Sequence, residues 1–135
     1  MPTLERVTAV VLDTHAWIWM AAGDERAGKL RGYAGRLLLP AIGVWETAML
    51  AAKGRLKLQP DVDTWVSQNL EAPVELEPLS SEISIRSSRL RDFHGDPADR
   101  LIVATALVLQ MPLVTADRQI HAWNRKTETL SLIEL

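Results

Sequence analysis

The fold is decided by the stretch VTAVVLDTHAWIW (residues 7–19), in which a run of apolar and mostly β-branched residues stops at an aspartate, Asp13. Near-continuous apolar strands are typical of parallel sheets that helices cover on both faces. The segment after Asp13 has the composition of a helix that ends near Gly23. The stretch therefore predicts a buried strand, an acid at its carboxyl end and a covering helix.

The same alternation of strand and helix continues along the chain. We expect further strands over residues 36–40, 74–77 and 112–117, and an edge strand over 129–135. Expected helices cover 24–34, 41–53, 60–71, 80–93 and 96–111, followed by a short helical turn over 118–124. Such alternation predicts a three-layer α/β domain, with a mainly parallel central sheet flanked by helices.

Composition and charge bound the class of protein. The chain has 135 residues, 47% apolar and 24% charged, so we expect one folded domain over residues 1–135. It has no cysteine, which excludes disulfides and thiolate metal sites and agrees with a cytoplasmic location. We expect neither a signal peptide nor a membrane span. With a net charge of −2, binding to nucleic acid must rely on local basic patches or bound cations.

Two carboxylates stand where apolar surroundings are expected. Asp13 ends the first strand, and ligands of open α/β sheets gather at the carboxyl ends of strands, although Asp13 also suits the cap of the next helix. Glu46 lies within AIGVWETAMLAA, where the residues three and four positions away carry no positive charge. Burying such a carboxylate is costly unless it gains a partner; the alternative is that it turns into solvent.

The stretch HGDPADRLIVATA (residues 94–106) opens the strongest predicted helix with two aspartates. Pro97 suits the first helical position, which makes Asp96 the natural cap. Asp99 shares a helix face with apolar residues and is expected to point towards the protein, unless it only favours the helix dipole. Asp117 ends the strand LVTAD as Asp13 ends the first strand, or caps the turn that follows.

These acids predict a metal site if the fold brings them together. Two close carboxylates repel each other by about 4 kcal/mol at a separation of roughly 4 Å with an effective dielectric constant of about 20. Several such groups must take up protons or hold a cation. An all-oxygen cluster selects a hard ion, Mg²⁺ or Mn²⁺, which suits hydrolysis of a phosphodiester by an activated water.

Taken together, VVLDTHAWIW, VWETAMLAAKGRL, HGDPADRLIVATA and LVTAD resemble the motifs of PIN-domain ribonucleases, and best those of the VapC-like toxins of bacterial toxin–antitoxin pairs. The resemblance covers nearly the whole chain, with the motifs in family order. It implies a PIN-like fold and Mg²⁺- or Mn²⁺-dependent endonucleolytic cleavage of RNA. It also implies a small VapB-like antitoxin that covers the site, and a homodimer.

The resemblance assigns metal-binding and catalytic roles residue by residue. These fall on Asp13, Glu46, Asp99 and Asp117. Asp96 matches a frequent companion aspartate of the family. One departure is that the family often carries serine or threonine shortly before the glutamate, where this chain has Gly43 and, further back, Pro40. The missing hydroxyl would remove a contact that supports the metal ligands.

Accessory candidates flank these acids. Thr14 and Thr115 are candidates to lend hydroxyls to the site. Arg100 and Arg118 each follow a proposed acid; they either contact phosphate or the antitoxin, or form ion pairs within the protein. Two rival functions are a catalytically inactive PIN-like binding module and a Mg²⁺-dependent phosphatase. Against the phosphatase, LDTH lacks a second aspartate two residues after the first.

Overall fold

The central sheet has five strands in the order β3-β2-β1-β4-β5. The computed structural model describes residues 2–135, and every pair of neighbouring strands in it is parallel. The strands are β1 (Ala9–Leu12), β2 (Arg36–Pro40), β3 (Val74–Glu77), β4 (Leu113–Thr115) and β5 (Leu132–Glu134). The predicted mainly parallel sheet is confirmed, and the last strand lies at an edge as expected.

Helices connect these strands in the expected order. They are η1 (Leu4–Arg6), α1 (Thr14–Ala21), η2 (Glu25–Leu30), α2 (Ala41–Ala52), α3 (Val62–Asn69), α4 (Ser81–Ser88), α5 (Pro97–Leu109) and α6 (Arg118–Thr127). The segment after residue 24 is a 3-10 helix, and α4 ends at Ser88 rather than near residue 93. The hydroxyls of Ser87 and Ser88 donate to carbonyls of this last turn, a type of bond that competes with continued helix.

The predicted short turn after Asp117 is instead a ten-residue helix, α6. Two local features explain its length. The Asp117 side chain caps it by accepting from the backbone N–H groups of Gln119 and Ile120, and a capped first turn favours propagation. Ile120 and Trp123 then lie on one face and are buried against the sheet.

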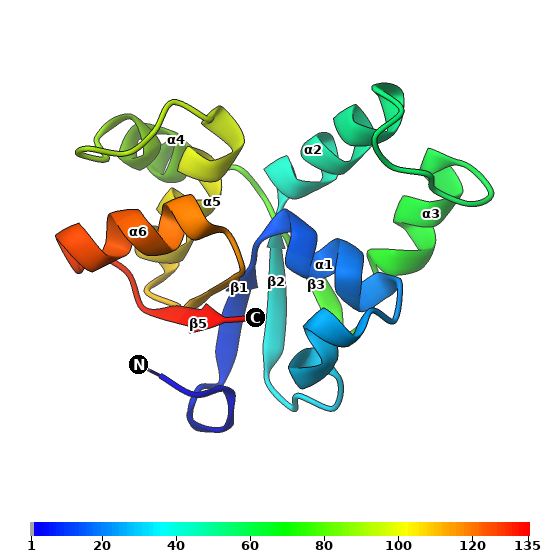
Figure 1. Ribbon diagram of the computed structural model, residues 1–135, viewed down its shortest axis with the longest axis horizontal. Coiled ribbons are helices and arrows are strands. Elements are labelled where there is room, and N and C mark those ends of the chain that lie inside the picture. Colours follow the sequence, from blue (N-terminus) through cyan, green and yellow to red (C-terminus); the bar gives the residue numbers. More distant parts are fainter. Residues whose placement is uncertain (1) are drawn as a thin grey trace.

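Helices cover both faces of the sheet, which makes three layers (Figure 1). One core contains Val10, Leu12 and Trp17 and joins β1 to α1 and η2. The other contains Val11 and Ile102 and joins β1 to α5 and α6. Because successive strand residues point to opposite faces, the continuously apolar β1 serves both cores. In the described chain, no helix is long and apolar enough to span a membrane.

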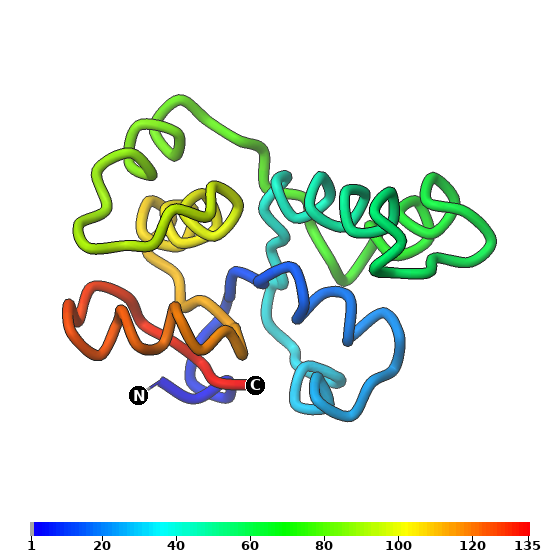
Figure 2. Tube along the Cα trace, turned by 45° about the horizontal axis from the view of Figure 1, so that its top comes forward, coloured from blue at the N-terminus to red at the C-terminus, as the bar shows by residue number. Residues whose placement is uncertain are grey.

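The strand order reverses at β1, and a ligand crevice is expected at the carboxyl edge of the sheet at this point. The chain leaves β1 towards β2 on one side, whereas β4 and β5 lie on the other side of β1. Such a reversal is the usual ligand site of open α/β sheets. In both views α2 and α3 extend to one side of this point, whereas α4, α5 and α6 lie on the other (Figures 1 and 2).

Candidate metal centre

Asp13 and Asp117 flank the reversal point of the sheet, because they closely follow β1 and β4. One oxygen of Asp13 accepts the Thr14 backbone N–H at 2.8 Å, and the other accepts the Thr115 hydroxyl at 2.6 Å. The same Thr115 hydroxyl accepts the backbone N–H of Asp117 at 2.9 Å. Thr115 therefore ties the two strand ends together and fixes how Asp13 faces the crevice.

The environment of Asp13 opposes its negative charge. The residue is 5% exposed, and burial raises the pKa of its carboxyl above the ordinary value. The bonds from Thr115 and Thr14 offset part of this rise, whereas the nearby charge of Asp117 adds to it. A bound cation would offset both the cost of burying the charge of Asp13 and the repulsion from Asp117.

Three further carboxylates, from α2 and the start of α5, lie close to one another. Oxygens of Glu46, Asp96 and Asp99 all lie within 4.8 Å of one another. Asp96 caps α5 as predicted, accepting from the backbone N–H groups of Ala98 and Asp99 with a single oxygen, Oδ1. Its second oxygen remains for the group, so the cap and a site role are compatible.

Asp99, at the start of α5, is also strongly perturbed. It is 7% exposed, and burial is the main reason that the pKa of its carboxyl rises to about 7. A contact of 2.8 Å between His94 Nε2 and Asp99 Oδ2 opposes the rise, whereas the charges of Asp96, Asp13 and Asp117 reinforce it. These acids, which include the four candidate site residues of the sequence, are therefore close enough to influence one another's charge.

Glu46 reaches this site from the second turn of α2. It is half-buried, and burial raises the pKa of its carboxyl, with the charges of Asp13 and Asp96 adding to the effect. The Thr14 hydroxyl offsets part of this rise. That hydroxyl is itself fully buried and has no hydrogen-bond partner of ordinary geometry among residues 2–135. An unpaired buried hydroxyl beside a carboxylate group fits a site built for a further polar guest.

Gly43 lies directly against this hydroxyl. A Cβ at Gly43 would lie 3.4 Å from Thr14 Oγ1 and 3.0 Å from Leu39 Cδ1. The glycine thus lets α2 approach β2 and α1 closely.

The donor set fits a divalent cation with oxygen preference. The group offers carboxylate oxygens from Glu46, Asp96 and Asp99, with Asp13 and the Thr14 hydroxyl beside it. Mg²⁺ and Mn²⁺ prefer such ligands, whereas zinc prefers histidine and cysteine. The imidazole of His94, which reaches the cluster, is already in contact with Asp99.

The two predicted arginines have different surroundings. Arg100 donates to the carbonyls of Ser87 and Phe93 at 2.9 and 3.2 Å and so holds the segment between α4 and α5. Phe93 in turn stacks on the His94 ring, with centroids 4.2 Å apart. Arg118, by contrast, is exposed at the start of α6. A phosphate contact by either arginine stays a prediction.

One supporting residue had no signal in the sequence. His121 lies in α6, and its Nε2 is 2.9 Å from the carbonyl oxygen of Thr115. Because a carbonyl only accepts, Nε2 must carry the hydrogen. The contact depends on how α6 packs beside β4, which no local pattern reveals.

A family model, the PIN domain, matches residues 10–126. The chain belongs to the PIN-domain family. A curated member, ribonuclease VapC22 of Mycobacterium tuberculosis (strain ATCC 25618 / H37Rv), is 36% identical, with 86% of this chain and 92% of the relative covered. The PIN-domain fold predicted from the sequence is thus confirmed.

Solved structures share the fold of this PIN domain at low sequence identity. A chain of DNA-bound VapBC from Salmonella typhimurium superposes with a TM-score of 0.72 at 17% identity, covering 95% of this chain and 98% of that one. A chain of the toxin–antitoxin complex VapBC-5 from Mycobacterium tuberculosis gives 0.66 at 20% identity, covering 96% and 100%. The likeness spans nearly the whole of each chain.

Proposed function

We propose that this PIN-domain protein is a Mg²⁺- or Mn²⁺-dependent endoribonuclease, the toxin of a toxin–antitoxin pair. The observation that carries the proposal is the meeting of Asp13, Glu46, Asp96, Asp99 and Asp117 at the carboxyl edge of the sheet. Burial that raises the pKa of carboxylates is typical of functional sites rather than of structural ion pairs. The similarity to ribonuclease VapC22 supports RNA as the substrate.

Each acid has a role that its surroundings support. Glu46, Asp96 and Asp99 would hold the ion, with Asp13 completing the site and Asp117 at its rim. When bound, a divalent cation would neutralise phosphate oxygens and lower the pKa of a water. Asp117 uses only Oδ1 to cap α6, so Oδ2 can orient the attacking water. Thr115 keeps Asp13 aligned, and His94 keeps Asp99 aligned.

The partners follow from the same assignment. We propose a small VapB-like antitoxin that covers the carboxylate site, a homodimer as the assembly of the toxin, and action in the cytoplasm. Structural relatives occur in VapBC toxin–antitoxin complexes, which supports the antitoxin. Co-purification of the toxin with the product of the adjacent reading frame tests this part of the proposal.

A cleavage assay tests the activity. Purified toxin, freed of antitoxin, is incubated with an unstructured RNA carrying a fluorophore and a quencher, with Mg²⁺, Mn²⁺ or chelator. We expect metal-dependent cleavage that falls at least about 100-fold in Asp13→Ala and in Asp99→Asn. Asp63→Asn, an exposed acid at the start of α3, is the matched control and retains activity. Full activity of either site variant, or none in the folded wild type, contradicts the proposal.

A further inference from the structure

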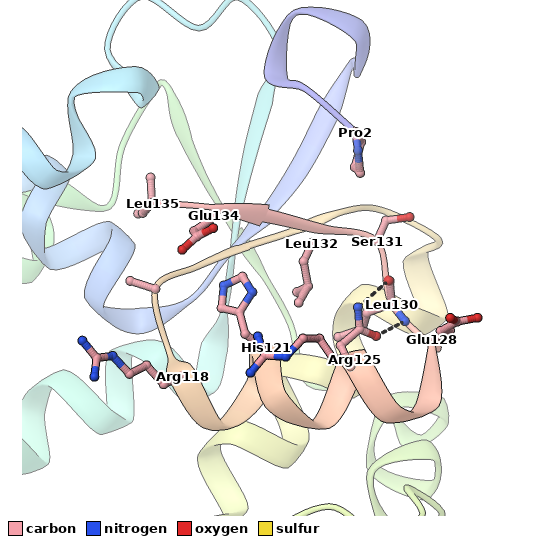
Figure 3. Close-up of a pocket in the computed structure, with 12 residues that line it drawn as sticks. Pro2, Arg118, His121, Arg125, Glu128, Leu130, Ser131, Leu132, Glu134 and Leu135 are labelled. Carbon is pink, nitrogen blue, oxygen red and sulfur yellow. Dashed lines mark hydrogen bonds between the residues drawn. The ribbon is translucent and has the colours of Figure 1, made fainter.

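A groove of about 970 Å³ runs between α6 and the edge strand β5 (Figure 3). It begins beside the carboxylate site, because Ala116 and Arg118, the two neighbours of Asp117 in sequence, both line it. From there it follows α6 to Glu128 at the end of the helix. One end of the groove therefore lies next to Asp117 in the chain, although none of the five clustered acids lines it.

The α6 wall of the groove carries a row of basic side chains. Arg118, His121 and Arg125 are spaced by three and four residues and so lie on one helix face, and all three line the groove (Figure 3). Arg118 and Arg125 are exposed. Within residues 2–135 neither guanidinium forms an ion pair. Two uncommitted cations thus face the solvent of the groove.

This wall is rigidly connected to the carboxylate site. The His121 ring donates from Nε2 to the carbonyl of Thr115 at 2.9 Å. The Thr115 hydroxyl in turn donates to Asp13 at 2.6 Å. Ile120 and Trp123, on the opposite face of α6, are buried in the core. The helix that carries the two arginines is therefore fixed relative to the acids, whereas the exposed guanidinium groups extend from it into the groove.

We propose that this groove binds the phosphate backbone of the RNA strand as it leaves the carboxylate site, with Arg118 and Arg125 contacting phosphates. The inference rests on the proposed ribonuclease function. A polyanion gains no bulk attraction from a protein of net charge −2, and the clustered acids repel it. Guanidinium groups beside the site offset this repulsion, and their planar donors match phosphate oxygens in pairs.

Two acids that line the groove allow the charge dependence of RNA binding to be tested in both directions. Glu134 lies on the β5 wall opposite α6, and Glu128 lies at the end of the groove far from Arg118 (Figure 3). Neither side chain has an ion-pair partner in the described part of the chain. Removing the Glu134 charge should therefore strengthen RNA binding, whereas removing an arginine should weaken it.

The test measures RNA binding separately from cleavage. A fluorescein-labelled unstructured RNA is titrated with toxin in chelator, and its Kd is followed by anisotropy over a range of salt concentrations. We expect the double variant R118A/R125A to raise Kd about tenfold. The slope of log Kd against log salt should fall by about 1.4, that is about 0.7 for each phosphate that an arginine no longer neutralises. E134Q should lower Kd, and the control R6A, at the amino end of the sheet, should leave it unchanged.

The outcomes separate this inference from the proposed function. An unchanged Kd and an unchanged salt slope in R118A/R125A would refute RNA binding by the groove, even if the wild type cleaves RNA. So would a double variant that loses affinity for the antitoxin but not for RNA, because the groove would then be a protein-binding surface. A wild type that binds RNA through the groove but never cleaves it with metal refutes the nuclease proposal alone.

Discussion

Replacing Asp99 by asparagine should stabilise the metal-free protein, although it destroys the proposed site. The carboxyl is 7% exposed, and its pKa rises from 3.8 to about 7 on folding. Between these values the unfolded chain binds fewer protons than the native protein, so wild-type stability falls as pH rises. The asparagine side chain does not titrate, and its amide can still pair with His94, so the variant lacks this fall.

The size of the effect follows from the shift in pKa. About 3 pH units at about 1.36 kcal/mol each give an upper limit of about 4 kcal/mol. The cost of desolvating the asparagine amide offsets part of this limit, so we expect Asp99→Asn to gain about 2 kcal/mol at pH above 7. Near pH 4 the wild-type carboxyl is protonated in the native state, and the gain should nearly vanish.

Urea unfolding in chelator, between pH 4 and 8, measures this difference. The matched control is Asp63→Asn, which should stay within about 0.5 kcal/mol of the wild type at each pH. If Asp99→Asn lost about 2 kcal/mol at pH 8, Asp99 would be a structural residue whose ionised form stabilises the fold. A pH-independent difference would show that its carboxyl does not titrate in this range, and the electrostatic account of the site would fail.

Three further substitutions test the supporting contacts. Thr115→Val removes the hydrogen-bond donor to Asp13 and the acceptor for the Asp117 N–H. We expect the free energy of unfolding to fall by about 1–3 kcal/mol, measured by thermal melting in chelator, and Mn²⁺ binding to weaken at least about tenfold, measured by calorimetry. An unchanged Mn²⁺ affinity would contradict the role of Thr115. Arg100→Ala should lower the free energy of unfolding by about 1–2 kcal/mol, because two carbonyls lose their hydrogen-bond donor. A loss of cleavage without any loss of stability would instead indicate that Arg100 contacts the substrate. Glu46→Gln should weaken Mn²⁺ binding at least about tenfold. The metal-free protein should be as stable as the wild type or more so, since burial raises the pKa of Glu46. An unaltered Mn²⁺ affinity would show that Glu46 is not a metal ligand.

The sequence was sufficient to predict the layers of the fold and to select most of the acids that the structure brings together. Continuous apolar strands that alternate with helices leave few alternatives to a parallel α/β sheet. Asp13 and Asp117 could be assigned to strand ends because each closes an apolar run. Asp96 was predicted as a cap, which it is, but its closeness to Glu46 depends on the crossing of α2 and α5, which no local pattern contains.

The remaining contacts depend on packing at a distance in sequence. His94 reaches Asp99 only because the segment between α4 and α5 folds back, held by Arg100. The full length of α6 was missed because its sequence is polar on most sides, and only two buried residues, Ile120 and Trp123, anchor it. Its row of basic residues therefore became visible only with the helix in place.

Anomalous scattering from crystals soaked in Mn²⁺ would show whether the clustered acids bind a divalent metal ion. We expect a Mn²⁺ peak within direct coordination distance, about 2.0–2.3 Å, of carboxylate oxygens from at least two of Glu46, Asp96, Asp99 and Asp13. The same peak should be absent from Asp99→Asn crystals. Saturating Mn²⁺ with no peak among these carboxylates, in crystals of a protein that still cleaves RNA, would contradict this expectation.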